Sequence, residues 1–139
     1  NFGNKLWNMA RFFLMMQEKL EAPITNNQIP NKGLQKSDTE ILNKLNETIT
    51  SVDKLLSEFR FAEAGDTIYH FMWDEVANKY LEEIKDRKDP EVALPVLHQI
   101  ILTGLKLLHP FMPFVTEAIW KEINPEVGML IVAEWPEVK

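Results

Sequence analysis

The chain has 139 residues, 45% of them apolar and 26% charged, which is the balance of a single soluble globular domain. It has no cysteine, which excludes disulfides, thiolate metal ligands and a thiol nucleophile. Its net charge of −6 argues against a general nucleic-acid coat, and no run approaches the ~18 apolar residues of a membrane span. The chain begins on Asn1, already in helical register, and we expect one domain (1–139) that is a piece of a larger protein.

Charge is unevenly distributed along the chain. Residues 1–36 hold five basic and two acidic side chains, a formal charge of +3, and the other residues hold ten basic and nineteen acidic ones, a charge of −9. A phosphate-bearing partner would therefore be drawn toward the N-terminal segment, in a manner that salt screens.

The opening segment, residues 1–19, is predicted to form a helix with two distinct rows of side chains. The first row is a wide stripe, apolar except for Gln17, that we expect in the core: Phe2, Leu6, Ala10, Phe13, Gln17 and Leu20. The second row follows its edge: Asn1, Lys5, Asn8 and Phe12. A cation, two amides and an aromatic ring suit a nucleobase and its phosphate, yet the same spacing fits an ordinary core-and-rim helix. The residues alone leave both interpretations open.

Four further helices are predicted. Residues 22–36 contain loop-forming Pro, Gly and Asn, and a connection of that length is either mobile or a binding loop. Ser37 and Glu40 then fit a capping box at the start of the second helix. The third helix runs from Phe61 to about Asp86, and because it is apolar over more than half its circumference we expect it to be central, with Trp73 in the core.

The fourth helix is expected over residues 91–108, with Gly104 marking a close helix contact. Two prolines make a corner over residues 109–113, a short fifth helix follows over 114–123, and the extended residues 129–136 should lie back over the bundle. The predicted fold is all-α: an antiparallel helix bundle of four long helices plus a short fifth.

The sequence contains no recognisable reaction centre. His70, His98 and His109 lie far apart, none with a second metal ligand three or four residues away, and no glycine-rich loop for phosphate is present. We therefore expect no catalytic residue, metal site or cofactor here, and interpret the chain as a binding or scaffolding module.

Several stretches closely resemble the anticodon-binding domain of valyl-tRNA synthetases. The similar stretches are residues 2–12, 38–47, 59–64, 69–75, 80–82, 107–120 and 134–136. The residues at 4–8 and His109 before Pro110 favour the valyl family over its leucyl and isoleucyl relatives.

This resemblance implies a parent enzyme, a cytoplasmic valine–tRNA ligase, that activates valine with ATP, with magnesium expected, and transfers it to tRNA. The catalytic HIGH and KMSKS signatures are absent here, so the chain would hold the anticodon stem-loop of tRNA(Val) while catalytic and editing domains of the parent perform the chemistry. The positions carried over as anticodon contacts are Lys5, Asn8 and Phe12. Arg11 lies off that row and is added as a candidate phosphate contact.

Two alternatives remain at this stage. The chain could be the same domain of an isoleucyl- or leucyl-tRNA synthetase. It could also be a helical module that binds a protein through the Trp7 region and the closing Trp135 segment.

Overall fold

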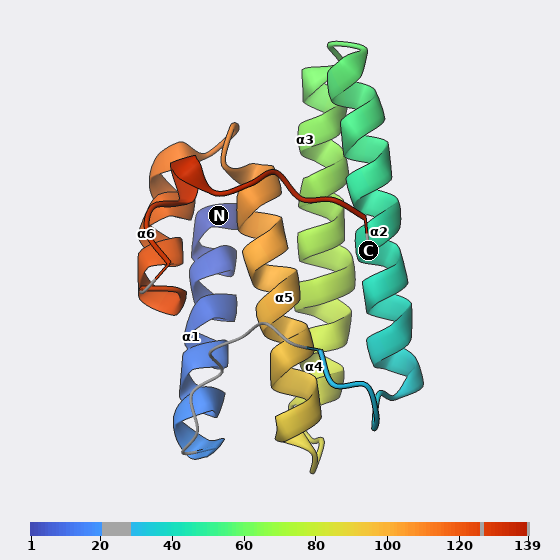
Figure 1. Cartoon of the computed structure of the whole chain (residues 1–139), viewed down its shortest axis with the longest axis vertical. Helices are drawn as coiled ribbons and strands as arrows, with labels where there is room; N and C mark the ends of the chain where they lie inside the picture. The colour runs from blue at the N-terminus through green and yellow to red at the C-terminus, as the bar shows by residue number, and fades with distance from the viewer. Residues whose placement is uncertain (21–28, 126, 139) are drawn as a thin grey trace.

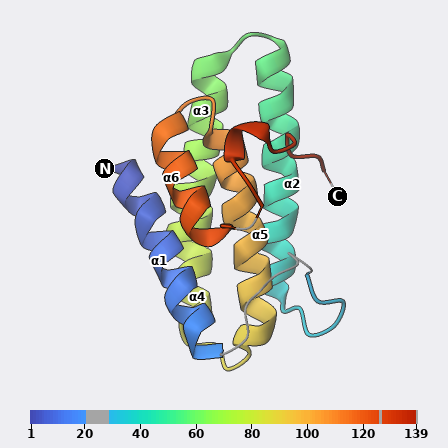
Figure 2. The ribbon, with the colours of Figure 1, turned by 60° about the vertical axis from the view of Figure 1, so that its left-hand side comes forward.

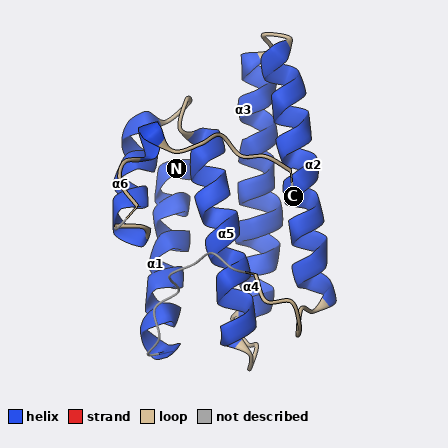
Figure 3. Ribbon diagram, in the orientation of Figure 1, coloured by secondary structure: helices blue, strands red, loops and turns tan. Residues whose placement is uncertain are grey.

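The computed structural model describes residues 1–20, 29–125 and 127–138, and across these residues it contains helices and no β-strand (Figures 1 and 3). The elements in chain order are α1 (Phe2–Leu20), α2 (Lys36–Ser57), α3 (Phe61–His70), the π-helical segment η1 (Phe71–Tyr80), α4 (Leu81–Ile84), α5 (Pro90–Leu108), α6 (Pro113–Ile123) and the 3₁₀ turn η2 (Leu130–Val132). Since α3, η1 and α4 follow one another without a break, they form one long helix. The predicted all-α fold is confirmed. Of the predicted loop at 22–36, residues 22–28 lie outside the described residues, residues 29–35 are non-helical, and Lys36 already belongs to α2.

The helices alternate in direction. α2 and α5 run opposite to α1, to the α3–η1–α4 helix and to α6 (Figures 1 and 2). The hairpin between α2 and α3 extends beyond the other helices at one end (Figure 1). After η2 the chain crosses back to α2, where the Trp135 indole nitrogen donates a hydrogen bond to Asp53 Oδ1 over 2.7 Å. The closing segment therefore lies over the bundle as predicted, with the addition of a 3₁₀ turn.

The centre of the bundle is α5, and not the third predicted helix. α5 packs against α1, α2, α3 and α6, and 14 of its 19 residues are buried. By length and composition alone it is apolar enough to cross a membrane, which corrects the expectation that no segment approaches a membrane span. Because 72% of that stretch is buried inside the protein, its apolar character is that of a core helix.

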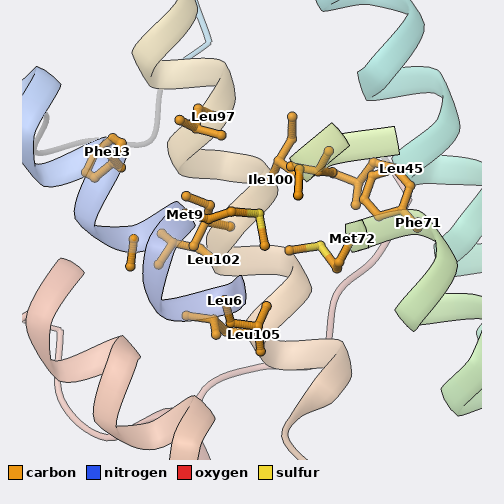
Figure 4. Close-up of a cluster of buried hydrophobic side chains, with 14 of the residues drawn as sticks. Leu6, Met9, Phe13, Leu45, Phe71, Met72, Leu97, Ile100, Leu102 and Leu105 are labelled. Carbon is orange, nitrogen blue, oxygen red and sulfur yellow. The ribbon is translucent and has the colours of Figure 1, made fainter. Parts of the chain in front are cut away.

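The contact between α1, α5 and η1 forms one side of the core. Met9 and Met72 are fully buried, and both side chains reach into the space between these three helices (Figure 4). Gly104 on α5 faces Met72 so closely that a Cβ there would lie 2.6 Å from the Met72 sulfur, which confirms the predicted close contact. The predicted stripe is confirmed for Leu6, Ala10 and Phe13. Its other members, Phe2, Gln17 and Leu20, are only half-buried.

The start of α2 differs from the predicted capping box. The residue before the helix is Gln35, and its backbone N–H donates to Asp38 Oδ2 over 2.9 Å. Asp38 is fully buried, and its burial is compensated because the Tyr80 hydroxyl and the Arg87 guanidinium each donate to its Oδ1 over 2.6 Å. The prediction of Ser37 and Glu40 as the capping pair was wrong, since partners distant in sequence fix the Asp38 carboxylate.

The π-helical segment was not predicted. Over Phe71–Tyr80 the backbone is π-helical, so each hydrogen bond joins the carbonyl of residue i to the N–H of residue i+5. This geometry occurs mostly as short insertions in α-helices, often beside functional sites. Trp73 lies in its first turn and is half-buried, so the expectation that Trp73 belongs to the core was wrong. The segment packs against α1 and brings Trp73 next to the edge of that helix.

Candidate nucleic-acid interface

The second row of side chains on α1 lies at the boundary between core and solvent. Asn1 and Asn8 are exposed, whereas Lys5 and Phe12 are half-buried. Lys5 and Phe12 are seven residues apart, which is about 10 Å along the helix axis. Nucleotides in a stacked strand rise about 3.4 Å each, so the row is long enough to meet consecutive bases of one strand.

The Lys5 ammonium lies over the face of an aromatic ring. Its Nζ is 4.8 Å from the centroid of the Trp73 ring, and within the described parts of the chain it forms no ion pair with a carboxylate. The acids that follow Trp73 are already engaged: Asp74 Oδ2 is 3.2 Å from His70 Nδ1, and Glu75 is 2.6 Å from Lys44 Nζ. The positive charge of Lys5 is therefore available to an incoming anion.

Asn8 and Arg11 are neighbours on the exposed side of the helix. The Arg11 guanidinium lies 5.7 Å from the centroid of the Trp7 ring and donates a long hydrogen bond of 3.4 Å to Asn8 Oδ1. Arg11 lies off the row by helical spacing, yet its side chain reaches the row at Asn8. The arrangement puts a second cation beside the amide.

The Phe12 ring is supported by the core and partly exposed to solvent. It is half-buried and packs against the main hydrophobic core. A ring held in this way loses little further freedom when a base stacks on it. Phe12 therefore has the exposure and the support that a stacking platform requires.

Three aromatic residues beside Lys5 were not recognised from the sequence as part of this surface. Phe2 and Tyr69 have ring centroids 4.7 Å apart, and the rings of Tyr69 and Trp73 are stacked at 5.5 Å with an angle of 22° between their planes. The i, i+4 spacing of Tyr69 and Trp73 was a visible signal. What the sequence lacked was the information that this face of the helix meets α1, since that depends on tertiary packing.

The histidines are used elsewhere, each in a different way. His98 is buried and stacked on Phe13, with ring centroids 4.8 Å apart. His109 Nδ1 lies 3.0 Å from Thr116 Oγ1 at the corner before α6. Among the described residues no group of three or more potential ligands is placed to hold a metal ion.

A comparison with protein families identifies the fold. The family model for the anticodon-binding domain of tRNA ligases matches residues 38–139. The chain belongs to this family. The matched region begins at α2, so α1 is not part of it.

Similar curated proteins extend the likeness through α1. A valine–tRNA ligase of Staphylococcus saprophyticus is 39% identical over 145 residues, and that of Fervidobacterium nodosum is 38% identical over 141 residues. The valine–tRNA ligase of Carboxydothermus hydrogenoformans is 41% identical over 142 residues. Each match covers 99% of this chain and 16% of the relative, so the chain spans about one sixth of the length of these proteins.

Proposed function

We propose that the chain is the anticodon-binding domain of a valine–tRNA ligase and that it holds the anticodon stem-loop of tRNA(Val). The observation that carries this proposal is the likeness of the whole chain, α1 included, to valine–tRNA ligases at 38–41% identity. It favours valine over isoleucine or leucine as the amino acid of the parent enzyme. Membership of the tRNA ligase family likewise favours RNA over a protein as the ligand.

In the parent enzyme the remaining five-sixths of the chain would contain the catalytic and editing domains. Those domains would bind ATP, with magnesium, and join valine to the tRNA in the cytoplasm. The contribution of this domain is binding energy and discrimination: it holds one end of the tRNA in a fixed position while the chemistry takes place at the other end. A module with this task needs rigid donors and stacking surfaces, and no nucleophile.

Phe12 and Asn8 are the proposed readers of the bases. An unpaired anticodon base would stack on the exposed part of the Phe12 ring, which the core holds in place. Asn8, exposed one turn earlier, offers an amide donor and an acceptor to the edge of a base. The aromatic ring supplies affinity that differs little among bases, and the amide supplies discrimination.

Lys5 and Arg11 are the proposed phosphate contacts. Each neutralised phosphate of a single strand releases counterions and adds about 0.7 to the slope of the logarithm of the binding constant against the logarithm of the salt concentration. Substituting Lys5→Met should therefore weaken binding and lower that slope by about 0.7. Lys121→Met, on the exposed surface of α6, is the matched control and should leave the slope unchanged.

The decisive experiment measures binding of the anticodon stem-loop RNA of tRNA(Val) to the chain by fluorescence titration and NMR shift mapping. Phe12→Ala should weaken binding about 5- to 150-fold, because a stacked base contributes about 1–3 kcal/mol. Phe12→Leu keeps an apolar side chain against the core but removes the flat ring, and should also weaken binding. Phe114→Ala is the control, since that phenylalanine is 91% exposed and lies on α6.

Two results would contradict the proposal. The first is an unchanged affinity for both Phe12 variants when circular dichroism shows that they remain folded. The second is an equal affinity for a stem-loop whose anticodon is scrambled, because the proposed site discriminates bases and does not bind RNA in general.

A further inference from the structure

The surface next to the proposed anticodon contacts contains an aromatic cluster at the edge of the core, against which Phe2 packs. Its members are Phe2 from α1, Tyr69 from the end of α3 and Trp73 from η1. Tyr69 is 36% exposed, and Phe2 and Trp73 are half-buried. Large rings that meet solvent beside a cation are more informative than rings inside the bundle.

The three rings support one another. Phe2 lies 4.7 Å from Tyr69 and 6.2 Å from Trp73, and Tyr69 is stacked on Trp73 at 5.5 Å. Two helices that are distant in sequence contribute to the cluster, and η1 packs directly against α1. The Trp73 ring thus packs against two other rings, and one charged residue lies over it.

That residue is Lys5. A lysine ammonium on a long, rotatable side chain is attracted to the negative face of an indole ring, which restricts the positions that the ammonium occupies. The ammonium has three N–H donors, so contact with the ring on one side leaves donors free for a phosphate oxygen on the other. Acids close to Trp73 in sequence do not compete, since His70 and Lys44 already pair with Asp74 and Glu75.

We infer that Trp73 is a positioning residue of the anticodon site, whose ring holds the Lys5 ammonium in place before the RNA arrives. The inference rests on the proposed function, because it assigns Lys5 to a phosphate of the bound anticodon loop. A lysine ordered in advance loses less side-chain freedom on binding, and the affinity for the RNA rises accordingly. Phe2 and Tyr69 act one step further back by fixing the Trp73 ring.

The arrangement of the free protein has its own spectroscopic signature. Protons above an indole ring experience its ring current, so the ε-methylene protons of Lys5 should resonate upfield of those of Lys121 in the absence of RNA. Trp73→Leu should return them to the ordinary position, and Trp73→Phe should keep part of the shift. Lys5 signals at the ordinary position in the unsubstituted chain would overturn the inference.

The binding experiment is a double-mutant cycle between Lys5→Met and Trp73→Leu, read with the anticodon stem-loop RNA of tRNA(Val). Trp73→Leu should weaken binding about 2- to 5-fold, the range of an exposed cation–π contact, and lower the salt slope. Trp73→Phe should restore most of the affinity. In the chain that already carries Lys5→Met, Trp73→Leu should have almost no further effect. Trp135→Leu, on the closing segment beside Asp53, is the control.

The outcomes separate the inference from the proposed function. If Lys5→Met binds the RNA as well as the unsubstituted chain, the proposed role of Lys5 fails, whatever Trp73 does. If Lys5→Met weakens binding but Trp73→Leu does not, only the positioning role fails. Equal losses from Trp73→Leu with and without Lys5→Met would mean that Trp73 acts independently of Lys5, and would also overturn the inference.

Discussion

The buried carboxylate of Asp38 is the best test of how this fold is held together. Asp38 accepts three hydrogen bonds: from the Tyr80 hydroxyl at 2.6 Å, from Arg87 Nη1 at 2.6 Å and from the Gln35 backbone at 2.9 Å. It has no exposed surface, and the Arg87 side chain is 8% exposed. These contacts join the first turn of α2 to the α3–η1–α4 helix and the turn after it. The site therefore links two long helices that meet only in the folded chain.

Replacing Asp38→Ala leaves the Tyr80 hydroxyl without its acceptor and removes one of two carboxylates from Arg87. Breaking a buried ion pair by removal of one partner costs about 3–5 kcal/mol. Because Arg87 keeps its bond of 2.6 Å to Asp89, we expect the lower end, about 3 kcal/mol. That is a large share of the 5–15 kcal/mol typical of a domain, and it should lower Tm by about 6–12 °C.

Urea unfolding followed by circular dichroism and tryptophan fluorescence measures this loss. Asp38→Asn keeps an acceptor oxygen without the charge and should cost about half as much as Asp38→Ala. The control is Glu63→Gln, which breaks an exposed pair with Arg60 and should change the free energy of unfolding by less than about 1 kcal/mol. A loss below 1 kcal/mol for Asp38→Ala would refute the view that this network fastens α2 to the bundle.

Three further predictions concern single residues. Burial, and then the hydrogen bond to Asp38, raise the pKa of Tyr80 above its usual value near 10. Because the unfolded chain then loses the Tyr80 proton at a lower pH than the folded chain, the free energy of unfolding should fall as pH rises above about 10. The expected decline is up to about 1.4 kcal/mol per pH unit. Urea titrations of Tyr80→Phe should lack that decline, and an identical decline would contradict the assignment. Burial lowers the pKa of His98, with a weaker opposing influence from the Ile123 backbone, and neither ring nitrogen has a hydrogen-bond partner of good geometry within the described chain. Because the unfolded chain binds a proton at this histidine more readily, the free energy of unfolding should fall as pH drops below about 6.5. His98→Leu should remove that pH dependence. If a substitution of the exposed His70 removed it instead, the assignment to His98 would be contradicted. Phe59 follows α2 by two residues, has φ of 59° and is 80% exposed. Phe59→Gly should therefore raise the free energy of unfolding by about 0.5–1 kcal/mol, and a loss would show that its side chain stabilises the hairpin.

The site residues were predictable only in part. The order Lys5, Asn8, Phe12 along one edge of α1 follows from helical spacing, and the family resemblance gave that edge a function that remains to be tested. Spacing placed Arg11 off the row, and only the side-chain geometry brings its guanidinium to Asn8. Trp73 was predicted to lie in the core because its helix is apolar on most sides. That pattern does not show which side of the helix remains exposed to solvent after the other helices have packed against it.

The sequence by itself determined which segments of this protein form helices. Periodic apolar residues fixed the long helices, and prolines at the starts of α5 and α6 mark their first turns, because a missing N–H costs nothing there. Burial of Leu6, Ala10 and Phe13 also follows from period alone. These features depend on neighbours a few residues away, which a linear pattern contains.

Tertiary structure decided everything that depends on residues distant in sequence. Tyr80 and Arg87 recruit Asp38 and so move the start of α2, and contact with α1 brings Trp73 under Lys5. Packing also made α5 the centre of the bundle, since four helices surround it. A hydrogen bond or a ring contact forms only between groups a few ångströms apart, and no periodicity in the sequence states which distant groups will meet.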